Sequence, residues 1–148
     1  QRGIEPAPAN NRVYNNTAYA GSAAVTLALI GSTATSTTVC NNLVAGPTGT
    51  PVVIWDLGSS GLVQSNNLAT NTPGFVSGSP VNGADFALAA GSPAIDCGTP
   101  VPVFDDYQLL GRPVGAYDAG AYEYHPANLA PAFNSDPIAK PSATVKKP

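Results

Sequence analysis

Short apolar segments alternate with small polar residues along the first half of the chain. Residues 25–30 and 52–56 each carry branched or long apolar side chains over a length typical of a β-strand. The two segments begin at Val25 and Val52. This pattern predicts an all-β fold built from short strands at a regular spacing.

A pair of Asn residues recurs near these strands. The second Asn of each pair stands at position 16, 42 and 67, so the spacing is nearly constant. A period of roughly 25 residues is typical of a solenoid. Asn tolerates the left-handed backbone of a sharp turn, and amides stacked about 4.8 Å apart can hydrogen-bond. We therefore expect Asn16, Asn42 and Asn67 to form a ladder. Unrelated turns in a β-sandwich are the alternative.

The Val-x-Asn-Asn pattern with periodic apolar strands covers roughly residues 10–76. It resembles the last rungs of right-handed parallel β-helix proteins, the pectate-lyase-like architecture. The resemblance implies that residues 1–76 are terminal rungs of such a helix.

The second half of the chain carries a longer motif. GSPAIDCG at 91–98 is followed by GRP at 111–113 and DAGAYEY at 118–124. This order is similar to the terminal segment of many bacterial surface β-helix proteins, although Cys97 and Ala119 depart from the residues usual there. The resemblance implies that residues 77–124 cap the apolar end of the solenoid, which otherwise has unpaired edges. The apolar side chains available as cover are Phe75, Phe86, Leu88, Ile95, Tyr117 and Tyr122.

Charge is scarce, at 10% of residues against about 25% in an ordinary soluble domain. Arg112 is the only Lys or Arg between Arg12 and Lys140. We expect it to form structural ion pairs in the cap, because a guanidinium can be held by two carboxylates. Candidate partners are Asp96, Asp118 and Glu123. Two alternatives use the same acidic region: a Ca²⁺ site formed by Asp105 and Asp106 with Asp96 and Asp118, and acid–base catalysis.

Composition excludes two classes of partner. The net charge is −3 with six scattered cations, so the chain has no basic surface for nucleic acid. No apolar run reaches the roughly 18 residues of a membrane span.

Cys40 and Cys97 lack metal-ligand spacing and are either buried thiols or one disulfide. We expect no resident cofactor and an extracellular or cell-surface location.

The Pro-rich residues 125–148 are interpreted as a linker, since their five prolines oppose regular structure. Residues 131–138 resemble the entry strand of immunoglobulin-like or cadherin-like repeats. We also expect an upstream β-helix segment to stack on the first rung, because about three rungs alone would expose apolar surface.

The first half offers little for catalysis, because Asp56 is the single charged residue between Arg12 and Asp85. Glycoside hydrolases use two carboxylates. We therefore interpret this chain as a non-catalytic, structural or adhesive part of its parent protein. The alternative is a polysaccharide lyase or hydrolase whose active site lies on upstream rungs. Trp55 and Asp56 are a possible glycan contact, since an indole stacks on sugar rings. Asn15 begins a glycosylation sequon whose use the sequence leaves open.

Overall fold

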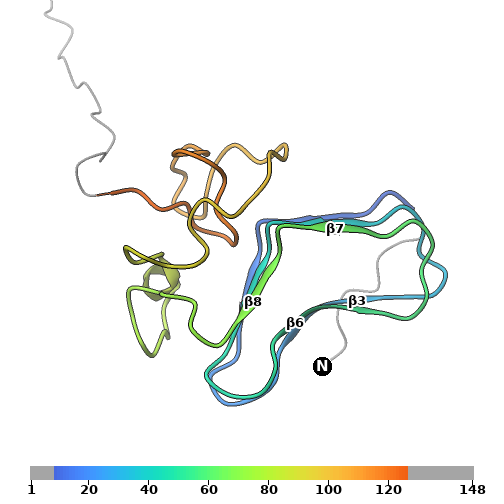
Figure 1. Cartoon of the computed structure of the whole chain (residues 1–148), viewed down its shortest axis with the longest axis horizontal. Helices are drawn as coiled ribbons and strands as arrows, with labels where there is room; N and C mark the ends of the chain where they lie inside the picture. The colour runs from blue at the N-terminus through green and yellow to red at the C-terminus, as the bar shows by residue number, and fades with distance from the viewer. Residues whose placement is uncertain (1–8, 127–148) are drawn as a thin grey trace, which may run out of the picture.

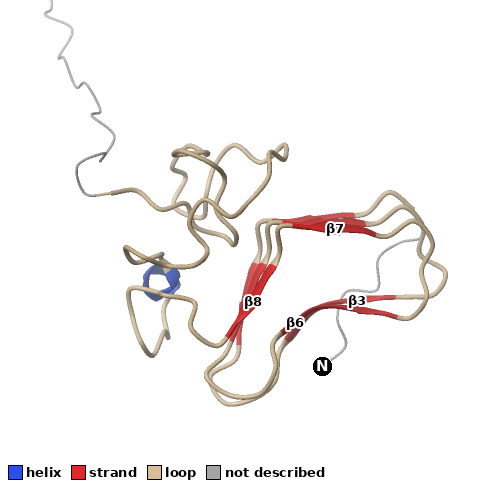
Figure 2. Cartoon of the chain, viewed as in Figure 1, coloured by secondary structure: helices blue, strands red, loops and turns tan. Residues whose placement is uncertain are grey.

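The computed structural model describes residues 9–126. Within that range the chain is all-β, apart from one short 3-10 helix (Figure 2). The predicted linker lies outside the described residues from 127 onward. The elements are β1 (Arg12–Tyr14), β2 (Thr17–Tyr19), β3 (Thr26–Ile30), β4 (Thr38–Cys40), β5 (Leu43–Ala45), β6 (Val52–Asp56), β7 (Val63–Ser65), β8 (Leu68–Thr70) and η1 (Gly83–Phe86).

The strands stack in three parallel sheets, with the orders β1-β4-β7, β2-β5-β8 and β3-β6. Arg12 pairs with Thr38, and Thr38 pairs with Val63, so successive rungs have nearly the same length. The all-β class and the parallel stacking of a solenoid are thus confirmed. The β-sandwich alternative is wrong, because a sandwich is built from antiparallel strands.

The Asn pairs form the corners between β1 and β2, β4 and β5, and β7 and β8. The first Asn of each pair is left-handed, with φ of 49° at Asn15, 56° at Asn41 and 52° at Asn66. A second left-handed corner precedes each rung's first strand, at residues 10, 36 and 61. These repeated turns allow each rung to lie in register on the next.

The second Asn of each pair joins neighbouring rungs. Asn16 Nδ2 donates to Asn42 Oδ1 at 2.9 Å, and Asn42 Nδ2 donates to Asn67 Oδ1 at 2.9 Å. The backbone N–H groups of Asn16 and Asn42 donate to the same oxygens at 3.0 Å. Asn42 also donates to the carbonyls of Val13 and Cys40, and it is fully buried. The amides therefore satisfy polar groups that would otherwise be buried unpaired.

The middle rung has the best-covered core. Val39 and Val44 are fully buried, whereas their partners in the third rung, Gln64 and Ala69, are exposed. The third rung has no described strand beyond β7 and β8, and these strands lie at the edges of their sheets. This end of the described solenoid is therefore open.

Residues 71–126, here called the lateral segment, lie beside the stacked rungs rather than over their end (Figure 1). Our expectation of an end cap is wrong in this respect. The apolar positions of the β2-β5-β8 sheet are the reason, since Leu43 and Ala45 share a core with the lateral segment. That core also contains Phe75, Leu88, Ala94, Ala119 and Tyr122, with Tyr19, Leu68, Phe86 and Ile95 among the partly buried residues against it.

One asparagine from each rung holds the lateral segment. Asn15 Nδ2 donates to the carbonyl of Asp118 at 3.0 Å. Asn41 Nδ2 donates to the Thr99 carbonyl at 2.7 Å. Asn66 Nδ2 donates to the Cys97 carbonyl at 2.9 Å. The lateral segment thus spans all three rungs, which a cap over one end would not do.

Gly120 marks the closest approach of the lateral segment to the sheet. Its φ is +98°, and its N–H donates to the Asn41 carbonyl at 2.7 Å. A Cβ at this position would lie 2.6 Å from Thr17 Oγ1 and 3.0 Å from Leu43 Cβ. Glycine is required here because both the backbone conformation and the available space exclude a side chain.

We predict that Asn42→Ala lowers the free energy of unfolding by about 2–4 kcal/mol, because several buried partners lose their hydrogen bonds. Asn16→Ala is the control: Asn16 is exposed at the first rung, so its replacement should cost less. Urea unfolding measures both values. Equal losses would contradict the role of the buried amide.

We predict that Gly120→Ala destabilises the chain by about 2–4 kcal/mol through left-handed strain and steric overlap with the sheet. Gly111→Ala is a matched control in the same segment, since a Cβ at Gly111 meets nothing within 4 Å. Thermal or urea unfolding compares the two variants. A Gly120→Ala chain as stable as Gly111→Ala would show that the lateral segment does not pack closely on the sheet.

Candidate functional site

The predicted ion-pair cluster lies inside the lateral segment, and its central cation is Arg112. The Arg112 side chain is 1% exposed, with Nη1 3.7 Å from Glu123 Oε2. Arg112 Nη2 donates to the Gly120 carbonyl at 2.9 Å. Among the described residues, Glu123 is the only carboxylate within ion-pairing distance of Arg112.

The structure gives Asp96 and Asp118 a different role from the predicted pairing with Arg112. Asp118 accepts the N–H of Asp96 at 2.7 Å and that of Tyr124 at 2.5 Å. Asp96 accepts the N–H of Ala116 at 2.8 Å. Both carboxylates therefore fix irregular backbone, since a loop without a strand partner needs other acceptors for its N–H groups.

Burial dominates the electrostatics of this cluster. It raises the pKa of the Glu123 carboxyl, although N–H groups of Val114 and Asp118 and the charge of Arg112 partly oppose the shift. It also raises the pKa of Asp118, against the hydrogen bonds from Asp96 and Tyr124. Burial lowers the pKa of Arg112, and the Glu123 carboxylate opposes this most. The charged forms of all three groups are thus held at a desolvation cost.

Asp105 and Asp106, the acidic pair that suggested a calcium site, differ in burial. Asp106 is buried and accepts the N–H groups of Gln108, Leu110 and Glu123, whereas Asp105 is exposed. Within residues 9–126, no group of three or more His, Cys, Asp or Glu side chains is arranged to hold a metal ion.

Trp55 and Asp56 lie on the β3-β6 sheet. Trp55 is 62% exposed and pairs in register with Leu29. Asp56 is exposed, and its Oδ1 accepts the N–H groups of Gly58 and Ser59 in the turn after β6. The indole is therefore accessible, while the carboxylate already holds a turn.

The remaining candidate residues are the two cysteines and Asn15 of the glycosylation sequon. Cys40 and Cys97 are both free thiols, Cys40 being buried. Asn15 is 7% exposed, and its Nδ2 donates into the lateral segment. Glycosylation of Asn15 is incompatible with this packing, because the same nitrogen would have to carry the glycan.

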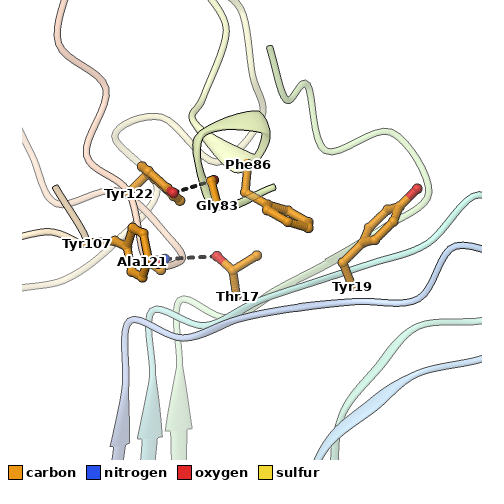
Figure 3. Close-up of a pocket in the computed structure, with 7 residues that line it drawn as sticks. All are labelled: Thr17, Tyr19, Gly83, Phe86, Tyr107, Ala121 and Tyr122. Atoms are coloured by element: carbon orange, nitrogen blue, oxygen red, sulfur yellow. Dashed lines mark hydrogen bonds between the residues drawn. The ribbon is translucent and has the colours of Figure 1, made fainter. Parts of the chain in front are cut away.

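A cavity of about 260 Å³ lies where the lateral segment meets strand β2 (Figure 3). Four aromatic rings contribute to its lining. Tyr19 and Phe86 meet edge to face with centroids 5.6 Å apart, and Tyr107 and Tyr122 lie 5.4 Å apart. The complete lining is Thr17, Tyr19, Gly83, Phe86, Tyr107, Ala121 and Tyr122. We call it the aromatic cavity.

Few polar groups reach the aromatic cavity. Thr17 Oγ1 accepts the N–H of Ala121 at 2.9 Å, and the Tyr122 hydroxyl donates to the Gly83 carbonyl. Figure 3 shows Gly83 and Thr17 between the pair Tyr107 and Tyr122 on one side and Phe86 and Tyr19 on the other. Sequence reasoning singled out Phe86 and Tyr122 as apolar cover and missed this cavity.

A second cavity of about 240 Å³ shares Tyr107 and Ala121 with the first. Its other lining residues are Tyr14, Asn15, Val103, Asp105, Asp106 and Arg112. We call it the polar cavity. Both cavities lie along the seam between the rungs and the lateral segment.

Comparison of the chain with protein-family models, with curated proteins and with solved structures finds no match. Across residues 9–126, no helix combines the length and the apolar character that a membrane crossing requires.

We predict that the contribution of Glu123 and Asp118 to the free energy of unfolding falls as the pH rises above about 4, the ordinary pKa of a carboxyl group. A carboxyl group with a raised pKa in the folded chain contributes stability below its unfolded pKa. That contribution is lost as the pH rises through the folded pKa. Urea unfolding at a series of pH values measures the slope. Glu123→Gln should make it shallower, and an unchanged slope in this variant would refute the assignment.

Proposed function

We propose that this chain is the non-catalytic C-terminal part of a secreted or cell-surface right-handed parallel β-helix protein, with a structural or adhesive role. Two features support this. The rungs are parallel and repeat at a nearly constant spacing, and the motif of residues 91–124 resembles the ends of bacterial surface β-helices.

The proposal is carried by the hydrogen bonds that the carboxylates of the lateral segment form with its backbone. Asp96, Asp106 and Asp118 each accept backbone N–H groups, and Glu123 accepts two such groups while it pairs with Arg112. A hydrolase needs two carboxylates on either side of a bound sugar. Carboxylates that already accept N–H groups of the loops favour a structural role over a catalytic one.

We further propose that an upstream β-helix segment stacks on the first rung. Strands β1, β2 and β3 lie at sheet edges, so their outer hydrogen-bonding groups have no described strand partner. The Asn ladder has a direction, since each amide donates to the carbonyl oxygen of the next rung. Asn16 Oδ1 is therefore the acceptor that a preceding rung would use.

The alternative is a polysaccharide lyase or hydrolase with its active site on upstream rungs. The exposed Trp55 favours it, because an accessible indole on a parallel sheet offers a stacking surface for a polysaccharide. Asp56 follows it in the sequence and is, besides Arg12, the only charged residue of the described rungs. This chain would then extend the groove without supplying the reacting groups.

Activity assays of the isolated chain test the non-catalytic assignment. Pectate, alginate, xylan and β-glucan are incubated with the chain, and unsaturated uronates and new reducing ends are measured. We expect no product above the rate without protein. Product that disappears in Asp105→Asn or Asp56→Asn, which replace exposed carboxylates, would contradict the proposal and establish catalysis in this chain.

A further inference from the structure

We propose that the aromatic cavity binds one uncharged sugar ring of a glycan. This inference rests on the adhesive form of the proposed function and gives it a ligand class and a site. The site is distinct from Trp55, because it lies on the seam between β2 and the lateral segment, whereas Trp55 lies on β6.

The size and the walls of the cavity define a single-ring ligand. Its volume of about 260 Å³ lies just below the range of about 300–1,000 Å³ that is typical of pockets for larger ligands. Tyr107 and Tyr122 line one side, and Phe86 and Tyr19 line the other (Figure 3). Aromatic walls suit the apolar C–H faces of a sugar, which a purely polar site would leave unmatched.

The polar groups of the cavity fit the edge of a sugar ring. The Thr17 hydroxyl accepts from Ala121 and keeps its own proton to donate. The Tyr122 hydroxyl donates to the Gly83 carbonyl, and both oxygens retain the capacity to accept a further bond. Hydroxyl and carbonyl groups between aromatic walls match a ligand with apolar faces and a hydroxylated rim.

The charges around the cavity distinguish between neutral and acidic sugars. The lining contains no charged side chain, and Asp105 and Asp106 line the adjoining polar cavity. Two neighbouring carboxylates disfavour the carboxylate of a uronic acid. Arg112 cannot offset them freely, because Glu123 pairs with it. An uncharged hexose or N-acetylated sugar is therefore the ligand class.

The polar cavity offers a place for the next sugar of the glycan. It adjoins the aromatic cavity across Tyr107 and Ala121. Asn15 Oδ1 and Arg112 Nε are buried there without a hydrogen-bond partner among the described residues, whereas Arg112 Nη1 is the atom that pairs with Glu123. The first two groups add an acceptor and a donor beside the ring site, as a chain of sugars requires.

Saturation-transfer NMR with the full chain tests the proposal. The probes are the methyl glycosides of glucose, galactose, mannose and N-acetylglucosamine, together with glucuronate, galacturonate and choline. We expect transfer to at least one uncharged glycoside, with at least a tenfold weaker affinity in Tyr107→Ala. Tyr107→Phe keeps the ring and should retain binding.

Phe104→Ala is the matched control, because Phe104 is 69% exposed, close to the 67% of Tyr107, and lines neither cavity. It should bind like the unchanged chain. Equal loss in both variants, transfer to no glycoside, or transfer to choline or the uronates alone would overturn the proposal. None of these outcomes affects the non-catalytic assignment, which the absence of polysaccharide cleavage tests separately.

Discussion

The paired asparagines at the corner of each rung are the constraint on which the rest of this structure depends. The first Asn takes the left-handed turn and holds the lateral segment, as Asn15, Asn41 and Asn66 do in successive rungs. The second Asn joins one rung to the next. Because side chains of adjacent residues leave the turn in different directions, two identical residues connect both the stack and its covering. Loss of this corner would disturb packing on both sides of the sheet.

Packing on the side rather than the end has consequences for the carboxylates that hold the loops of the lateral segment. Without strand partners, its loops need acceptors for their N–H groups, and Asp96, Asp106 and Asp118 supply them. The same geometry leaves the third rung open. It also creates the seam in which both cavities lie. Stability and the proposed ligand site are thus products of one interface, the contact of the lateral segment with β2-β5-β8.

The repeated features could be predicted from the sequence, because period and residue type agree in each rung. The strands around Val52 and the ladder position of Asn42 follow from this agreement. The second corner could not be predicted, since its left-handed residues, Asn10, Ser36 and Gly61, differ in type. Neither could the aromatic cavity, which joins Thr17 to Ala121 across 104 residues. An apolar residue such as Phe86 signals burial but not the surface that it covers.

Hydrogen exchange measured by NMR tests the central claim, that the lateral segment folds as one unit with the side of the rungs. Thr99 and Gly120 donate their N–H groups to Asn41, and Leu43 donates its own to Asn16 within the solenoid. If the account is correct, these three amides exchange through the same opening and show similar protection. Protection of Leu43 with rapid exchange of Thr99 and Gly120 would contradict it, because the lateral segment would then open independently of the rungs.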